Sequence, residues 1–325
     1  MLAGAATLAA GSGIAAERPV AGPSMAGFAV PAMERVRIAF IGVGERGSAA
    51  VKRVSRIPGC VVEAICDLRK EAVDSNQKWL KENRRDNVAK RFYSGTSECW
   101  KGACDDSGVD LVYVAVPAYL HARIAVYAMN AGKHVLVEVP AANTLDDCWN
   151  IVETSERTRR HCMMLENCCY GEYEMLALNM IRMGLFGEIV HGEAGYIHDQ
   201  RGLGHMMPPD DPTKTRVIGG KVVPAVGPTG AMLGSYGRHH GNWYPTHGLG
   251  PVARCMNINH GDRFDYLVSL ESKQASLEAY GKGRFPKDSW QANWKVVKGD
   301  MNQSLIRTVM GKSILLQHDV MSPRP

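Results

Sequence analysis

The chain has 325 residues, of which 45% are hydrophobic and 22% are charged, a composition typical of a globular protein. That length is enough for two domains, each with its own hydrophobic core. The formal net charge is +5 and the basic residues are scattered, so the sequence lacks the concentrated basic surface of a nucleic-acid-binding protein. The nine cysteines are odd in number and lack metal-type spacing, so we expect most of them to be buried small apolar residues.

The N-terminal residues 1–33 have the pattern of an export segment followed by a linker. Residues 2–16 are an apolar run of small residues, like the core and cleavage site of a signal peptide, although no basic region precedes them. The run is too short and too rich in alanine and glycine to span a bilayer. We expect export, to a periplasm. The alternative is an unstructured Ala/Gly tail on a cytoplasmic protein.

A glycine-rich turn follows the first predicted strand. Residues 36–41 are typical of a buried parallel strand, and Gly42-Val43-Gly44-Glu45-Arg46-Gly47 leads from it into a predicted helix. In such a turn Gly42 reverses the chain, Gly44 lets the backbone approach a pyrophosphate, and Gly47 packs helix on strand. This context predicts a dinucleotide site with the phosphates at the helix N-terminus.

An acidic residue ends the second predicted strand. Residues 61–66 lead to Asp67, about twenty residues after Gly47, which is the separation that ribose recognition requires. A carboxylate here can accept hydrogen bonds from both ribose hydroxyls and would repel a 2′-phosphate. The sequence therefore favours NAD over NADP, although Arg69 leaves NADP open. The alternative for Asp67 is a solvated carboxylate at a strand end.

Two more strand–turn units complete the first predicted domain, residues 34–166. Residues 109–116 lead to a turn that ends at His121, and residues 133–137 lead to Glu138-Val139-Pro140. Strands that alternate with helices predict right-handed crossovers in a parallel, doubly wound sheet of the Rossmann type. Ligands of such sheets bind beyond the carboxyl ends of the strands, where we expect both turns.

The second predicted domain, residues 167–325, is an α+β domain with an open, largely antiparallel sheet. The elements that we expect in it are a helix at 172–183, a strand at 188–196, and strands with one solvated face at 265–270 and 313–318. Residues 201–238 are rich in Gly, Pro and Asp, and we interpret them as a long loop near the site entrance.

The order of these motifs resembles the Gfo/Idh/MocA oxidoreductase family across residues 35 to 145. In that family the turn at Glu138-Val139-Pro140 usually reads Glu-Lys-Pro, and the lysine is the acid/base for alcohol oxidation. The valine, the run at residues 164–171 and the sequence Tyr244-Pro245-Thr246-His247 resemble one branch, glycoside hydrolase family 109. Its members are NAD-dependent α-N-acetylgalactosaminidases.

The resemblance implies which residues contact each ligand. Together with the three glycines of the turn, the implied cofactor contacts are Glu45, Arg46, Asp67, His121, Glu138, Val139 and Asn167. The implied sugar contacts are Tyr196, Tyr244, Pro245, Thr246 and His247. We expect His247 and Tyr244 to transfer protons, since a histidine titrates near neutral pH and a tyrosine offers a rigid O–H.

Simpler interpretations stay open for some of these residues. Tyr196 could be a core-strand tyrosine, and His247 could be a histidine at a helix start whose nitrogens are satisfied. A zinc site on His239, His240 and His247 is conceivable, but no cysteine or carboxylate of metal-type spacing stands nearby. We therefore predict no metal.

The chain departs from the family in three places. It has Ala118-Tyr119-Leu120-His121 where the family usually has Trp-x-x-Trp-His. It has Ala231-Met232 in place of a Trp-Arg pair whose arginine contacts sugar, and Arg216 or Arg238 could replace that arginine. In the family an active-site tyrosine would follow Pro325, so we expect the second domain to be incomplete.

The implied activity is hydrolysis of terminal α-N-acetylgalactosaminides. In this hypothesis NAD oxidises C3 of the sugar, a base removes the acidified C2 hydrogen, the C1 substituent leaves, water adds, and the hydride returns. Two alternatives stay open: an NAD-dependent oxidoreductase acting on a sugar or cyclitol, and an inactive NAD-containing sugar-binding protein. The sequence also leaves open a homo-oligomer.

Overall fold

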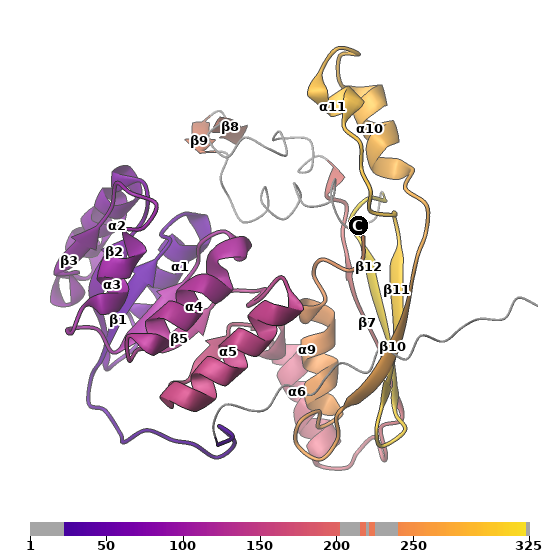
Figure 1. The fold of residues 1–325 in the computed structure, drawn as a ribbon, viewed down its shortest axis with the longest axis horizontal. Helices are drawn as coiled ribbons and strands as arrows, with labels where there is room; N and C mark the ends of the chain where they lie inside the picture. Colours follow the sequence, from indigo (N-terminus) through magenta and orange to yellow (C-terminus); the bar gives the residue numbers. More distant parts are fainter. Residues whose placement is uncertain (1–22, 202–214, 219–220, 225–239, 323–325) are drawn as a thin grey trace, which may run out of the picture.

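The computed structural model describes residues 23–201, 215–218, 221–224 and 240–322 (Figure 1). Most of the predicted export segment lies outside the described residues, so that prediction stays untested. No helix in the described ranges combines the length and the apolar character needed to cross a membrane.

The first domain is a six-stranded parallel sheet in the order β3-β2-β1-β4-β5-β6, with helices on both faces. Its strands are β1 (Val36–Ile41), β2 (Cys60–Cys66), β3 (Arg91–Tyr93), β4 (Leu111–Val114), β5 (His134–Val137) and β6 (Cys162–Met164). Its helices are α1 (Glu45–Val54), α2 (Lys70–Asn83), η1 (Arg85–Asn87), α3 (Trp100–Asp105), η2 (Ala118–Leu120), α4 (His121–Asn130) and α5 (Leu145–Thr158). The predicted doubly wound Rossmann sheet is confirmed.

Two hydrophobic clusters, one on each face of the sheet, hold this domain together. Strand β1 supplies both, because alternate side chains of a strand point to opposite faces. Ile38 and Phe40 pack with apolar residues of α1 and α2, whereas Ala39 and Ile41 pack with those of α3 and α4. All four side chains are at most 2% exposed, as expected for a central parallel strand covered on both faces.

The second domain packs one helix against a four-stranded sheet in the order β10-β11-β12-β7, and a second helix packs against the first. Its elements are η3 (Asn167–Cys169), α6 (Glu172–Arg182), β7 (His191–Ile197), β8 (Thr215–Ile218), β9 (Lys221–Pro224), α9 (Thr246–Cys255), β10 (Phe264–Glu271), α10 (Ser276–Arg284), α11 (Trp290–Asn293), β11 (Asn302–Thr308) and β12 (Ser313–Asp319). Strands β10, β11 and β12 pair antiparallel, and β7 joins β12 in parallel. The prediction of a largely antiparallel sheet is confirmed.

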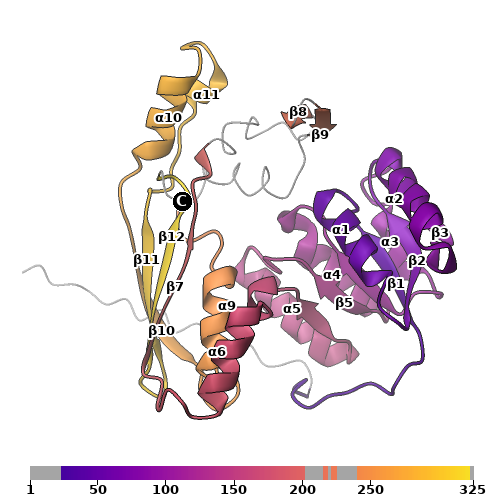
Figure 2. The same cartoon turned by 180° about the vertical axis from the view of Figure 1, so that it is seen from behind.

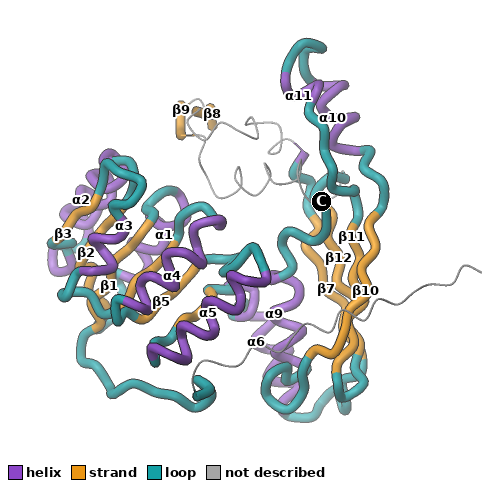
Figure 3. The backbone as a smooth tube through the Cα atoms, viewed as in Figure 1, coloured by secondary structure: helices purple, strands orange, loops and turns teal. Residues whose placement is uncertain are grey.

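Helices α6 and α9 lie between this sheet and the first domain, as the front and back views show (Figures 1 and 2). The strands form a single layer next to them (Figure 3). Because α9 also adjoins η3, which follows the last strand of the first domain, α9 lies beside the junction of the two domains.

Two predictions about the second domain were wrong in part. Strand β10 was expected to have one solvated face, but all its residues from Phe264 to Leu270 are exposed. Strand β10 lies at the edge of the sheet. Helix α9 covers β7 and β12, at the other side of the sheet, and leaves β10 exposed. The predicted loop at 201–238 contains an antiparallel hairpin, β8–β9, while the rest of it lies outside the described residues. The Gly219-Gly220 pair between β-branched runs is a hairpin signal that the loop interpretation overlooked.

The cysteines are less buried than predicted. All nine are free, and only Cys66, Cys104 and Cys169 are buried. Cys148 is exposed on α5, and the remaining five are half-buried.

Replacing Phe40 by alanine should destabilise the first domain strongly. Phe40 is 0% exposed and stacks on Tyr113 with ring centroids 5.4 Å apart, so the substitution leaves a cavity. We expect a loss of about 3–5 kcal/mol in the free energy of unfolding, measured by urea denaturation. The matched control is Phe92→Ala, because Phe92 is 48% exposed. Similar losses in both variants would contradict this account of the core.

Candidate active site

The glycine-rich turn at the end of β1 uses its three glycines in different ways. Gly42 has φ +84°, and a Cβ there would lie 2.6 Å from the carbonyl oxygen of Ala115. A Cβ on Gly47 would clash with the carbonyl oxygen of Gly42. A Cβ on Gly44 would meet only the Arg69 guanidinium, at 3.6 Å. The first and third glycines are therefore required by packing, and the second leaves open space into which a pyrophosphate fits.

Asp67 ties this turn to the next one. Its side chain is buried, its Oδ2 accepts from the backbone N–H of Val43 at 2.9 Å, and its Oδ1 accepts from that of Arg69 at 2.9 Å. The Arg69 Nε also lies 3.3 Å from Oδ1. The alternative of a solvated carboxylate was wrong, because Asp67 holds the dinucleotide-binding turn in shape.

Three predicted cofactor residues from different strand ends form one polar chain. The Arg46 Nε of α1 lies 3.1 Å from Oε1 of Glu138, which follows β5 and is buried. The other end of the Arg46 guanidinium donates to Oδ1 of Asn167, after β6, at 3.1 Å. The Tyr113 hydroxyl donates to Glu138 Oε1 at 2.8 Å. The structure thus brings Arg46, Glu138 and Asn167 together at the carboxyl edge of the sheet.

His121 has a different environment from the one expected of a cofactor contact. It is 2% exposed; its Nδ1 lies 2.7 Å from the carbonyl oxygen of Pro140 and its Nε2 lies 2.8 Å from that of Val116. Burial lowers the pKa of its imidazole. Because both ring nitrogens face backbone carbonyls, His121 joins the turns after β4 and β5. Of the neighbouring predicted residues, Glu45 is exposed in the first turn of α1 and Val139 is half-buried.

The predicted sugar-binding residues meet where β7 faces the start of α9. Tyr244 and Pro245 precede the helix, and Thr246 and His247 begin it. The Tyr244 ring centroid lies 4.6 Å from that of His247 and 4.6 Å from that of Tyr196. Tyr196 also packs against a small core cluster, as expected of a core-strand tyrosine, and its contact with sugar stays a prediction. Burial raises the pKa of Tyr244 and of Tyr196, which keeps both phenols protonated.

The carboxylate of Glu166, for which the sequence predicted no role, contacts His247. The Glu166 Oε1 lies 2.6 Å from His247 Nδ1 and also accepts from the backbone N–H of Cys168 at 3.0 Å. Burial would raise the pKa of Glu166, but the contacts with His247, the Cys168 N–H and the Thr246 hydroxyl hold that pKa below its ordinary value, so the group is ionised. The signal in the sequence is an acidic residue directly after the last parallel strand.

Two glycines of α9 let it come close enough for this contact. A Cβ on Gly248 would lie 2.7 Å from the backbone nitrogen of Gly195 in β7. A Cβ on Gly250 would lie 3.0 Å from both Cys169 Sγ and Glu166 Cγ. Small residues on this face of the helix therefore bring His247 to Glu166 and to Tyr196.

Of the histidines considered for zinc, the two that the structure describes have separate partners, since His247 contacts Glu166. The Nδ1 of His240 lies 2.7 Å from Oε2 of Glu271, a contact in which His247 takes no part. His239 lies outside the described residues, as do Arg238 and the Ala231-Met232 pair. The replacement for the family's sugar-binding arginine therefore stays open between Arg216, on β8, and Arg238.

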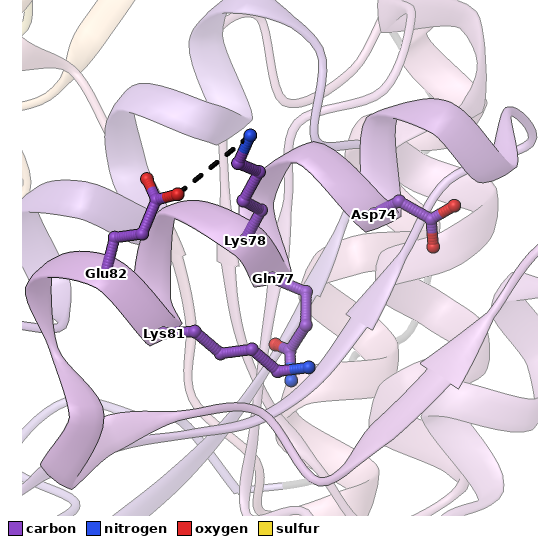
Figure 4. A pocket seen from close by; sticks show the side chains of 5 residues that line it. All are labelled: Asp74, Gln77, Lys78, Lys81 and Glu82. Atoms are coloured by element: carbon purple, nitrogen blue, oxygen red, sulfur yellow. Dashed lines mark ion pairs between the residues drawn. The ribbon is translucent and has the colours of Figure 1, made fainter.

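A hollow on the outer face of α2 is a poor candidate for a substrate site. Figure 4 shows that its lining comes from this single helix, with Lys78 and Glu82 joined by an ion pair of 4.0 Å. The lining residues are Asp74, Gln77, Lys78, Lys81 and Glu82. Long charged side chains one turn apart are typical of a solvated helix surface.

Comparison with known proteins identifies the family. Residues 36–166 match the model of the oxidoreductase family with an NAD-binding Rossmann fold, and residues 170–325 match the glycosyl hydrolase 109 C-terminal domain. A glycosyl hydrolase family 109 protein from Phocaeicola vulgatus is 42% identical over 93% of this chain and 69% of its own length. The chain belongs to glycosyl hydrolase family 109. Its first half is thus an NAD-binding Rossmann domain.

Two further proteins place this family 109 chain among its relatives. An α-N-acetylgalactosaminidase from Shewanella oneidensis is 41% identical over 95% of this chain. The chain spans 63% of that relative's length, which is less than two thirds. A levoglucosan dehydrogenase, solved with NADH and levoglucosan, shares the fold with a TM-score of 0.61 at 19% identity, covering 89% of this chain and 68% of its own.

Replacing Asp67 by alanine should weaken NAD binding to this family 109 protein. The substitution removes the acceptor of two backbone N–H groups and the carboxylate expected to recognise the ribose. We expect the dissociation constant for NAD to rise at least about tenfold, measured by calorimetric titration. Asp74→Ala on the exposed face of α2 is the control and should bind NAD normally. Unchanged affinity in Asp67→Ala would contradict the assigned ribose contact.

Proposed function

We propose that this protein hydrolyses terminal α-N-acetylgalactosaminides with bound NAD as a catalytic redox partner. Membership of family 109 and the name of the Shewanella oneidensis relative, an α-N-acetylgalactosaminidase, support the substrate class. The observation that carries the mechanism is the 2.6 Å contact between His247 and Glu166, beside Tyr244. These groups can move protons in a protein whose first half holds a hydride acceptor.

The residues expected to hold NAD are the glycines of the turn, Asp67, and the polar chain through Arg46 and Glu138. When bound there, NAD accepts a hydride from the sugar and returns it, so that the net reaction is hydrolysis. Val139 stands where alcohol-oxidising members of the wider family usually carry a lysine. Since valine carries no titratable proton, the proton transfers fall to other side chains.

His247 is suited to act as the base. A carboxylate only accepts hydrogen bonds, so Nδ1 of His247 carries the proton that lies towards Glu166. The neutral ring then has its basic lone pair on Nε2, which takes a proton from the sugar at the C3 hydroxyl or at C2. The buried Glu166 carboxylate stabilises the imidazolium that results.

Tyr244 is suited to act as the acid. Burial raises the pKa of its phenol above the ordinary 10.0, so the group keeps its proton at neutral pH. Its ring lies 4.6 Å from that of His247, close enough for both groups to reach one sugar ring. Tyr244 therefore donates a hydrogen bond or a proton to a sugar oxygen while His247 accepts one.

An experiment in deuterated water tests the elimination. NAD-loaded protein is incubated with a chromogenic α-N-acetylgalactosaminide, and the released sugar is examined by NMR. We expect deuterium at C2, because a proton that leaves this carbon exchanges with solvent before water adds. Release of sugar without deuterium would rule out elimination. NADH accumulating in step with substrate loss would favour the net oxidoreductase, and binding without turnover the inactive sugar-binding protein.

His247→Gln should lower glycoside release by about 10²–10⁴-fold, the usual contribution of a general base. NAD affinity should be unchanged, because His247 lies on α9 outside the Rossmann domain. The matched control is His260→Gln, which changes an exposed histidine. Equal activity of the two variants would contradict the role of His247.

Glu166→Gln should lower stability in a pH-dependent way. The pKa of Glu166 lies below its ordinary 4.5 in the folded protein, so the ionised group contributes stability above pH 4.5 that is lost as the pH falls through the folded-state pKa. The difference in unfolding free energy between wild type and Glu166→Gln should therefore be widest near neutral pH and become smaller as the pH falls below 4.5. Urea denaturation across this pH range measures it.

The control for that series is Glu172→Gln, which changes an exposed carboxylate of α6. This variant should track wild type at every pH. If the difference in unfolding free energy between wild type and Glu166→Gln did not change with pH, the charge of the carboxylate would not contribute to stability.

A further inference from the structure

Three side chains near the start of α9 have the composition of a metal site. The ligand atoms of Glu166, Cys168 and His247 all lie within 4.8 Å of one another. Among the residues that the structure describes, no other group of three histidine, cysteine or acidic side chains meets that condition. Two of the three belong to the turn after β6, and the third to the first turn of α9.

The donor set selects the class of metal. One imidazole nitrogen, one sulfur and one carboxylate oxygen are ligands that zinc accepts in tetrahedral sites. Calcium and magnesium require oxygen ligands almost exclusively, so this set disfavours them. Three protein ligands leave a fourth position for water or another small ligand, as in open zinc sites.

The state of Glu166 indicates that the site can accept a cation. The residue is 5% exposed, and its Oε2 is buried without a hydrogen-bond partner in the described part of the chain, although the Thr246 hydroxyl contributes to lowering the pKa of the carboxyl. A buried carboxylate oxygen without a donor is costly, because it has lost its water and gained nothing in return. A cation bound at this carboxylate would compensate that loss.

The local backbone already holds two of the ligands in place. Glu166 and Cys168 flank the first residue of η3, and the Cys168 N–H donates to Glu166 Oε1 at 3.0 Å. His247 is fixed by the close packing of α9, and its Nδ1 lies 2.6 Å from the same Oε1. A cation would enter between these atoms by small side-chain rotations.

We propose that Glu166, Cys168 and His247 form a zinc-binding site. Cys168 would bind as a thiolate and release its proton into solvent when the metal enters. Zinc with one thiolate, one carboxylate and one neutral imidazole has no net charge, which suits a largely buried position. Zinc at Nδ1 replaces the proton that His247 otherwise directs to Glu166.

The metal-bound form would differ from the metal-free form in the ability of His247 to transfer a proton. With Nδ1 coordinated and Glu166 engaged by zinc, His247 cannot form the imidazolium–carboxylate pair that proton transfer needs. Zinc would therefore inhibit the activity proposed above. Metal binding itself does not rest on that activity, because it requires only the three ligands.

Cobalt(II) provides a direct readout, since it occupies zinc sites and a thiolate bound to it gives a near-ultraviolet charge-transfer absorption. The whole protein, free of affinity tags, is titrated with Co²⁺ and then with Zn²⁺ or Mg²⁺. We expect the band to saturate at one equivalent of cobalt, to disappear on addition of zinc and to persist with magnesium. A titration that produces no thiolate band would overturn the proposal.

Variants assign the ligands. Cys168→Ser should abolish the band, whereas Cys148→Ser, at an exposed cysteine of α5, should keep it. His247→Gln should weaken cobalt binding by more than the roughly 10–100-fold loss typical of outer-shell changes, and it provides the test if Cys168→Ser does not fold. A band that survives in Cys168→Ser, or unchanged cobalt affinity in His247→Gln, would show that the metal binds elsewhere.

Discussion

A buried carboxylate that meets a histidine from the other half of the chain is the interaction on which the site depends. Glu166 follows the last strand of the Rossmann sheet, and His247 begins α9 of the second domain. The contact of 2.6 Å places an ionised group away from water. Removing one partner of a buried pair leaves the other uncompensated, which is strongly destabilising. The pair therefore stabilises the domain arrangement and orients the histidine.

The cofactor side of the site is organised by a second set of polar contacts. Arg46 reaches from the first helix to Glu138 and Asn167, so that three strand ends of the Rossmann sheet share one guanidinium. Asn167 lies next to Glu166 in sequence. The groups expected to hold NAD and the groups expected to move protons are thus joined through a single turn, as the proposed mechanism requires of groups that act on one sugar.

The same three atoms around Glu166 can serve two states of the protein. With a proton on Nδ1, His247 has a basic nitrogen free for the sugar. With zinc in place of that proton, the ring becomes a ligand and Cys168 is drawn in as a thiolate. Proton and metal compete for the same lone pair, which is why a site built for acid–base chemistry also has the donors of a zinc site.

Local patterns in the sequence determined the Rossmann half. Alternating strands and helices, the glycine turn and Asp67 are short-range signals, because each depends on residues that are close along the chain. The Tyr244-Pro245-Thr246-His247 motif likewise indicated the family, whereas its contact with sugar stays a prediction. These features could be predicted without coordinates, as could the largely antiparallel second sheet.

Only the tertiary structure decided which partners these residues meet. Glu166 and His247 are 81 residues apart, and no periodicity relates them. His121 matches the family motif in sequence, but in the fold both of its ring nitrogens face backbone carbonyl oxygens, those of Pro140 and Val116. The exposure of β10 depends on which strands α9 covers. Contacts of this kind arise when elements that are distant in the sequence pack together. Sequence patterns predict the individual elements but not how they pack.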